Sequence, residues 1–279
     1  MTQVLVRPQK VATRSIRTTG TVARSMLLLN QCLLGLALVA IWWLFSVSGS
    51  LSADVLPSPG KVAESMFDLA ATPDFWAALS FTLSNALLGL VLGCLVAVPL
   101  GLLLGLWPAL ERTTRLLADF GRSFPVIALL PVMILILGAT PRMEVTVVFL
   151  GVVWPVLLQT IYGSRRIDPV VRDTVRAFQI PLWLRFSRVL LPAAAPFTAT
   201  GIRVAASASI LLAVAVEVLG KTPGIGFELV NAQSDGRPEI AFAYIAYSGL
   251  LGVLLNFALS AVEEKLLGWN SRGDKKVAR

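Results

Sequence analysis

The chain alternates long apolar runs with short polar segments, and the runs are long enough to cross a membrane. A helix needs about 20 residues to span the hydrocarbon of a bilayer. The candidate runs cover residues 26–46, 82–106, 126–138, 145–162, 198–219 and 240–259. The third run is the shortest, and Pro125 and Pro131 interrupt it, although membrane helices tolerate proline where neighbouring groups satisfy the freed backbone. The first run is too long for the apolar core of a cleaved signal peptide. The pattern predicts an all-α integral membrane protein with about six transmembrane helices.

Lys and Arg residues are concentrated in alternate connecting segments. Nineteen of the 24 lie before the first run, between the second and third, between the fourth and fifth, or after the sixth. The other connecting segments hold four, and Arg203 lies inside the fifth run. Because excess positive charge stays on the cytoplasmic side, both termini are predicted to be cytoplasmic. The expected organisation is a basic tail over 1–25, a transmembrane domain over 26–268 and a second basic tail over 269–279.

Composition excludes several classes of function. The 279 residues are 56% hydrophobic and only 14% charged, whereas an average soluble chain is about 45–50% apolar and about 25% charged. With no histidine and two cysteines, the chain lacks the usual ligands of a metal site. No run carries paired acids or a nucleophile beside a base, so we expect no catalytic residues. The net charge is +8, and the basic residues that produce it are distributed according to the predicted topology. They are not interleaved with aromatic residues of the kind that stack on nucleic-acid bases, so nucleic-acid binding is not expected.

The second run carries small residues at intervals of four, which places them on one helix face. Small stripes of this kind let membrane helices approach closely, so we expect tight packing against another helix; lining a narrow pathway is the alternative. The stripe consists of Asn85, Gly89, Gly93, Ala97, Gly101 and Gly105. A weaker stripe in the sixth run consists of Ser248, Gly252, Asn256 and Ser260.

Two ionisable residues of the fifth run are functional candidates because burying charge in a membrane is costly. Arg203 is placed to extend to the cytoplasmic interface. Glu217 is either interfacial or part of an external gate; fourteen residues of helix put it about 21 Å from Arg203, too far for an ion pair. Candidate pathway or gate residues are Asn85, Ser207, Glu217 and Asn256.

The segment 164–196 is too long and too basic for a simple turn, and loops of this length usually have a function. Asp168 and Pro169 predict a helix start. Pro181 ends that helix, and a second is expected over 182–191, before Pro192. The predicted helical hairpin carries apolar residues that suit a partner's groove, or that pack back on the bundle or the lipid surface: Val175, Phe178, Ile180 and Trp183.

This segment resembles the cytoplasmic "EAA" loop of binding-protein-dependent ABC transporter permeases. The loop has an acid, two alanines, a glycine and a downstream Leu-Pro pair. Asp173 takes the acid position, Thr174 and Val175 replace the alanines, and Gln179 replaces the glycine. Leu191 and Pro192 match the Leu-Pro pair. Further stretches resemble the nitrate/sulfonate/taurine subfamily: residues 56–59, 124–126, 130–131, 154–155, 159–160, 163 and 222–226.

The resemblance implies a type I ABC importer permease fold in the cell membrane. Such a subunit works with a second permease, two cytoplasmic ATPases and an extracytoplasmic solute-binding protein, and imports a small, anionic solute. A homodimer is favoured, while the departures at the EAA positions leave a heterodimer open. ATP and Mg would be bound by the ATPase: Gly220-Lys221-Thr222 lacks the earlier glycine of a phosphate loop, since Ala215 stands there. A secondary transporter is the alternative. The implied coupling residues are Asp173, Arg176, Phe178, Gln179, Pro181, Trp183, Leu191 and Pro192.

Overall fold

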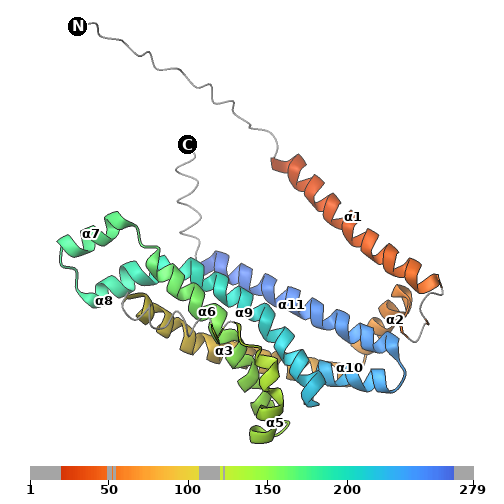
Figure 1. Ribbon diagram of the computed structural model, residues 1–279. Helices are drawn as coiled ribbons and strands as arrows, with labels where there is room; N and C mark the ends of the chain where they lie inside the picture. Colours follow the sequence, from red (N-terminus) through yellow and green to blue (C-terminus); the bar gives the residue numbers. More distant parts are fainter. Residues whose placement is uncertain (1–19, 49–51, 53–54, 107–119, 122, 267–279) are drawn as a thin grey trace. The chain divides into compact units, whose positions relative to one another are not determined.

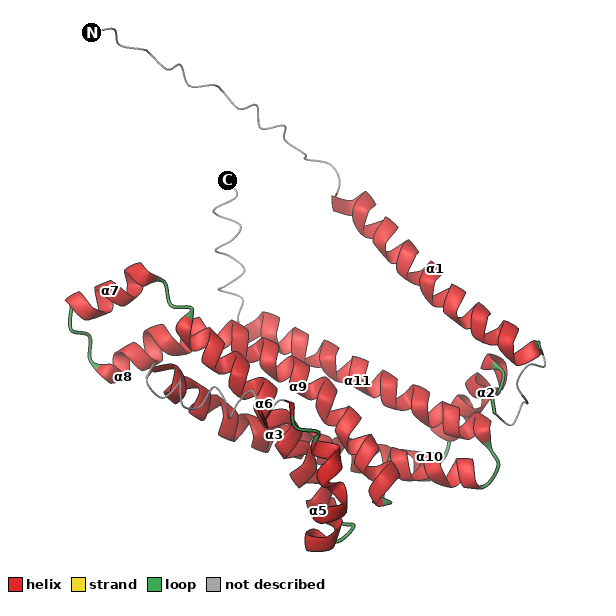
Figure 2. Cartoon of the chain, viewed as in Figure 1, coloured by secondary structure: helices red, strands yellow, loops and turns green. Residues whose placement is uncertain are grey.

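The computed structural model describes residues 20–48, 52, 55–106, 120–121 and 123–266, and all regular structure in these residues is helical (Figures 1 and 2). The chain divides into two units, residues 1–59 and 60–279. In the first unit, α1 (Gly20–Val47) is a single apolar helix. After it the chain folds back locally, because Trp42 Nε1 donates a hydrogen bond to the carbonyl oxygen of Pro57 at 3.1 Å.

The second unit is a helical bundle. Its helices are α2 (Pro59–Ala70), α3 (Pro73–Leu106), η1 (Val126–Leu129), α5 (Leu130–Leu137), α6 (Pro141–Arg165), α7 (Pro169–Ala177), α8 (Leu182–Arg185), the π-helical η2 (Phe186–Leu190), α9 (Leu191–Gly220), α10 (Ile225–Ser234) and α11 (Pro238–Leu266).

Three long helices form the centre of this unit. Helices α3, α6 and α9 pack on one another, and α10 and α11 lie against α9. Along α6, Val148, Val152 and Val156 are completely buried at intervals of one turn. They face the small residues of α3 and the alanine-rich face of α9, where Ala205 and Ala213 are also completely buried. Small side chains on two helices and β-branched ones on the third therefore produce a closely packed centre.

Five helical segments are long and apolar enough to cross a membrane: Leu29–Val47, Pro73–Leu106, Pro141–Arg165, Leu182–Gly220 and Pro238–Leu266. The expected span over 126–138 is shorter in the described residues than a full crossing requires. Its described helix runs only over Val126–Leu137, which gives about 20 Å of rise against about 30 Å of hydrocarbon. Pro131 stands in the first turn of α5, and Gly138 ends the helix at a φ of 69°.

Several helices begin earlier than the apolar runs predict. Helix α3 begins at Pro73 rather than residue 82, and α6 begins at Pro141 rather than residue 145. The hydroxyl of Thr140 caps α6 by accepting a hydrogen bond from the Met143 N–H. Helix α1 begins at Gly20, inside the predicted tail 1–25. Many of the basic residues counted for topology, at 1–19, 107–119, 122 and 267–279, lie outside the described residues.

Candidate functional site

The predicted hairpin begins with a capped helix, as the sequence indicates. The Asp168 side chain accepts a hydrogen bond from the Val170 N–H at 2.8 Å, and Pro169 occupies the first turn of α7. The aspartate side chain accepts a hydrogen bond from one of the N–H groups that are free at a helix start. Proline in the first turn has no N–H that would be left unpaired. The start of α7 is therefore fixed by its own sequence.

The structure at the end of α7 shows why a glycine would suit the position of Gln179, the glycine position of the EAA loop. The Ile180 N–H donates to the Val175 carbonyl, and the Gln179 N–H donates to the Arg176 carbonyl, which is the Schellman pattern of a helix end. Gln179 has a φ of 47°. This left-handed conformation suits glycine, because a side chain there crowds the backbone. Gln179 thus keeps the turn of the motif without its usual residue.

Beyond this turn, the hairpin exposes large apolar side chains. Phe178 is 78% exposed, Leu182 76% and Trp183 71%. Val175, by contrast, is buried at 6% exposure. Pro181 is exposed and precedes α8, as predicted. Within the described residues, the hairpin therefore does not pack its apolar tip back on the bundle, and a patch made of Phe178, Leu182 and Trp183 is exposed.

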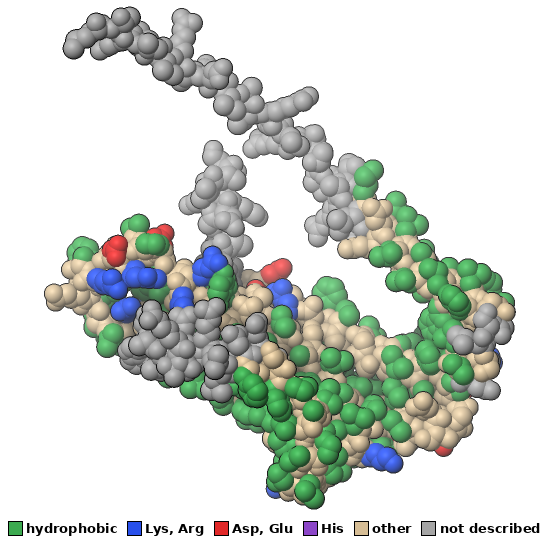
Figure 3. All heavy atoms as spheres, in the orientation of Figure 1, with side chains coloured by type: hydrophobic (Ala, Val, Ile, Leu, Met, Phe, Trp, Pro, Cys, Tyr) green, Lys and Arg blue, Asp and Glu red, His purple; other side chains and the backbone are tan. Residues whose placement is uncertain are grey.

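Charged residues surround this apolar patch. Asp173 and Arg176 are both exposed on α7. Figure 3 shows Lys and Arg side chains gathered around α7 and α8. The hairpin therefore combines an exposed apolar patch with Lys and Arg side chains around α7 and α8.

The predicted helix end before Pro192 is wrong. Helix α8 continues through η2 into α9, so that Leu182–Gly220 is one helical segment of 39 residues. Pro192 stands in the first turn of α9 and has no N–H to donate. In the π turn before it, the Leu191 N–H donates to the carbonyl oxygen of Phe186, five residues earlier. This wider turn lets the helix continue although Pro192 donates no hydrogen bond. Leu191 and Pro192 therefore lie within a continuous helical segment.

The glycine stripe of α3 faces α6. A Cβ on Gly89 would lie 2.6 Å from Val148 Cγ1, and one on Gly101 would lie 2.7 Å from Thr160 Cβ. Side chains on Gly93 and Gly105 would overlap α6 residues Val152 and Ser164 in the same way. In the sixth run, Gly252 has no atom within 4 Å of a Cβ position. The first stripe brings two helices into backbone contact, and the second does not do so within the described chain.

Asn85 and Glu217 come together with an acid that the sequence analysis did not select. Asn85 Nδ2 donates to Glu144 Oε2 at 3.0 Å, and the Thr222 hydroxyl donates to the same oxygen at 3.3 Å. The Gly226 N–H donates to Glu217 Oε2 at 2.7 Å. Both glutamates are completely buried within the bundle.

This buried cluster fixes the turn between α9 and α10. Thr82 Oγ1 accepts a hydrogen bond from the Ile225 N–H at 2.9 Å. Gly224 has a φ of 151°, and any side chain on it would overlap the Glu217 carboxyl group. The cluster lies near the start of α6 and the end of α9, and about 31 Å of helix separates Glu144 from Arg165 at the other end of α6. Glu144 was missed because it lies directly before the predicted run 145–162.

The remaining pathway candidates lie in a different place. Ser207 is exposed on α9, and its hydroxyl donates to the Arg203 carbonyl at 3.5 Å. Asn256 is half-buried on α11, and its Oδ1 is buried without a hydrogen-bond partner. Arg203 forms an ion pair with Glu263 of α11. The four candidates therefore do not form a single site: Asn85 and Glu217 meet, while Ser207 and Asn256 lie nearer the middle of α9 and α11.

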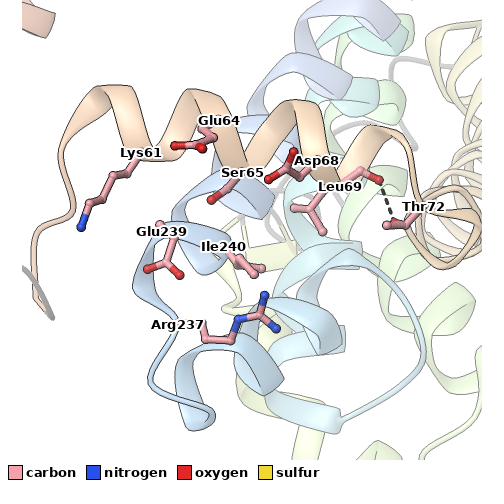
Figure 4. A pocket seen from close by; sticks show the side chains of 9 residues that line it. All are labelled: Lys61, Glu64, Ser65, Asp68, Leu69, Thr72, Arg237, Glu239 and Ile240. Atoms are coloured by element: carbon pink, nitrogen blue, oxygen red, sulfur yellow. Dashed lines mark hydrogen bonds between the residues drawn. The ribbon is translucent and has the colours of Figure 1, made fainter.

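A cavity of about 480 Å³ lies between α2 and the start of α11 (Figure 4). Side chains of both charges line it, including Lys61, Glu64 and Asp68 from α2 and Arg237 and Glu239 beside α11. Because the lining carries both charges, it can form ion pairs with the charged side chains of another protein. A small ion of a single charge would be attracted by some of these side chains and repelled by the others.

Comparisons with known proteins agree with this architecture. Residues 89–268 match the family described as binding-protein-dependent transport system inner membrane component. The aliphatic sulfonates permease SsuC of Escherichia coli is 30% identical over 237 residues, covering 85% of this chain and 90% of SsuC. The taurine permease TauC of the same organism is 26% identical over 245 residues, covering 84% and 86% of the two chains.

A solved structure shows the same fold. The MetNI methionine ABC transporter, in inward-facing conformations, has a chain that superposes with a TM-score of 0.62 at 18% identity, covering 69% of this chain and 95% of that one. The family match covers more than half of this chain, and the apolar helices fit a membrane-embedded protein. The chain belongs to the binding-protein-dependent inner membrane components, and within them it is an ABC transporter permease of the nitrate/sulfonate/taurine subfamily.

Proposed function

We propose that this permease is the membrane-spanning subunit of an ATP-driven importer that receives its solute from a separate binding protein. The single observation that carries the proposal is the apolar patch of the hairpin, Phe178, Leu182 and Trp183, which is exposed at the end of a continuous helix. If the hairpin projects from the membrane into water, as in the EAA loop that it resembles, an exposed cluster of large apolar side chains favours a protein partner. In an ABC importer that partner is the ATPase.

The same geometry supports a route for coupling. The hairpin joins α6 to α9 directly, and these two helices pack on each other and on α3. Movement of a docked hairpin would therefore shift α6 and α9 together and expose the pathway to alternate sides. ATP and Mg would be held by the ATPase subunits.

Two copies of a permease are expected in one transporter, because the family that the chain belongs to works with paired permease subunits. We favour a homodimer. The departures from the EAA pattern at Thr174, Val175 and Gln179 keep a second, different permease as the alternative. The exposed face of α9 that carries Ser207, between Val204 and Leu211, is our candidate for the pathway wall.

The solute is proposed to be a small organic or inorganic anion. This proposal is supported by the similar permeases, which are named for aliphatic sulfonates, taurine and nitrate. The binding protein would perform most of the selection. Its docking is proposed at the end of the bundle away from the hairpin, where the mixed-charge cavity between α2 and α11 lies.

The test replaces Phe178 or Trp183 with aspartate. Both side chains are more than two-thirds exposed, so the permease should still fold and insert, while the added charge should abolish ATPase co-purification and solute uptake. Phe178→Leu and Trp183→Phe keep the patch apolar and should retain both. Ser234→Asp adds the same charge at the exposed end of α10, away from the hairpin, and should retain ATPase co-purification.

Normal ATPase recovery with both aspartate variants would refute docking through this patch. Solute uptake by the purified permease in vesicles without any ATPase would refute the importer itself and favour a secondary transporter.

A further inference from the structure

A second feature of the hairpin is a basic cavity on its inner side. The cavity measures about 310 Å³ and is enclosed by the ends of α3 and α6 together with α7 and α8. Its described lining holds four arginines, Arg165, Arg172, Arg176 and Arg185, and no carboxylate. Basic residues that serve only topology have no need to converge. Here they converge on one cavity from three helices.

The helix geometry explains the convergence. Arg172 and Arg176 are four residues apart on α7 and therefore lie on one face. Arg165 is the last residue of α6, and Arg185 is the last residue of α8. The hydrogen bond shown for Arg172 reaches a neutral backbone oxygen, since its Nη2 donates to the carbonyl oxygen of Arg165 at 3.5 Å.

The two acids of the described hairpin are directed elsewhere. Asp168 is engaged as the cap of α7, where it accepts from the Val170 N–H. Asp173 follows Arg172 directly, so it is turned by about 100° around the helix axis, and it does not line the cavity. Among the described lining residues, no carboxylate therefore stands beside Arg172, Arg176 and Arg185 to balance their charges.

We propose that this cavity binds an oxyanion, namely a phosphate, sulfate or sulfonate group, supplied by the headgroup of an anionic phospholipid or by a free anion. Guanidinium groups match such groups with paired, charge-assisted hydrogen bonds. The volume lies at the lower end of the range for small-molecule sites, about 300–1,000 Å³. Basic pockets at the cytoplasmic ends of membrane helices bind lipid headgroups by the same chemistry.

A bound oxyanion would connect the hairpin to the bundle. Val175 is the only buried residue in α7, so apolar packing holds this helix weakly. An anion shared by Arg172 and Arg176 of α7, Arg165 of α6 and Arg185 of α8 would fix the hairpin at a defined angle. The anion site does not depend on the proposed function. Its consequence for coupling does, because only an ATPase-docked hairpin transmits the added rigidity.

The experiment uses the full-length permease purified in a neutral detergent. Its thermal unfolding is followed during titration with inorganic sulfate, and separately with phosphatidylglycerol or phosphatidylcholine. The test variant is Arg172→Gln/Arg176→Gln, which removes two charges from the cavity. The control is Arg166→Gln/Arg188→Gln, which removes two charges from the same region outside the cavity lining. Amide hydrogen exchange over residues 169–185 reports whether the hairpin becomes ordered.

We expect sulfate or phosphatidylglycerol to raise the unfolding temperature of the wild type and to slow exchange in the hairpin. The test variant should bind about 10- to 100-fold more weakly, the range that corresponds to loss of charged hydrogen bonds. The control should bind as the wild type does. A response to phosphatidylglycerol alone identifies a lipid site, and a response to sulfate identifies a site for free anions.

Two results would overturn the proposal. One is that neither sulfate nor phosphatidylglycerol acts more strongly than phosphatidylcholine on the wild type. The other is that both double variants lose binding equally, since attraction to the general positive charge would then suffice. Neither result bears on the ATPase, because no ATPase is present in these measurements.

Discussion

The contact between α3 and α6 can be tested at Gly93. An added Cβ there would overlap Val152 Cγ2, whereas the next nearest atoms, Val152 Cβ and Val153 N, would both be 3.7 Å away. The overlap is deeper than about 1 Å relative to the preferred carbon separation of about 3.5–4.0 Å. Val152 cannot turn aside easily, because valine in a helix has one strongly preferred rotamer and this one is completely buried.

Gly93→Ala should therefore destabilise the bundle. Overpacking costs about 1–3 kcal/mol, and the higher helix propensity of alanine returns at most about 1 kcal/mol. Val152→Ala alone should cost about 1–3 kcal/mol, since it leaves a cavity. In the double variant the new methyl group occupies part of that cavity, with its nearest neighbours at ordinary contact distance. The two changes should thus compensate by about 2 kcal/mol, within the range of about 0.5–3 kcal/mol for contacting residues.

The assay is the unfolding of the four proteins in detergent, arranged as a double-mutant cycle. Gly249→Ala on α11 is the control, because no atom lies within 4 Å of its Cβ position. It should be neutral or slightly stabilising. The reasoning would be refuted if Gly93→Ala were as stable as the wild type, or if Val152→Ala in its background added its full cost.

Three further predictions concern single contacts. Gln179→Gly should raise the free energy of unfolding by up to about 1 kcal/mol, because glycine adopts the positive φ without strain; thermal unfolding measures this, and a loss of stability would contradict it. Thr82→Val should cost about 1–3 kcal/mol by leaving the buried Ile225 N–H unpaired, while Thr82→Ser should restore stability, and equal stability of both variants would count against the hydrogen bond. Glu144→Ala should destabilise more than Glu144→Gln, because glutamine still offers an oxygen to Asn85; the same assay ranks the two, and the opposite order would disprove the assignment.

The sequence predicts most of the fold because membrane crossing depends on local composition. Long apolar runs and the Asp168-Pro169 cap are signals carried by neighbouring residues, and both are found as helices in the structure. Glycines at intervals of four identify a helix face, yet the intervals alone do not say whether a partner helix is present. Gly93 meets Val152, while Gly252 meets nothing. That difference depends on tertiary packing.

The sites were harder to predict for the same reason. Glu144 lies at the polar edge of an apolar run, and only the meeting of α3, α6 and α9 shows that it is buried beside Glu217. Pro192 reads locally as a helix breaker, but the preceding π turn lets the helix continue through it. The arginines of the basic cavity come from three helices, and neither charge counts nor spacing reveals that Arg165 and Arg185 line the same cavity as Arg176.

The uninterrupted helix from α8 into α9 has a consequence for the direction in which the hairpin points. Each residue of an α-helix turns the chain by about 100°, so the number of residues between the hairpin and the bundle sets their relative rotation. Deleting one residue within 186–189 would turn Leu182 and Trp183 toward another side of the helix axis, while Leu190 keeps its buried contacts with the bundle. The direction of the exposed patch is thus encoded by the length of the connecting helix, and a protein with every patch residue intact could still present it to the wrong side.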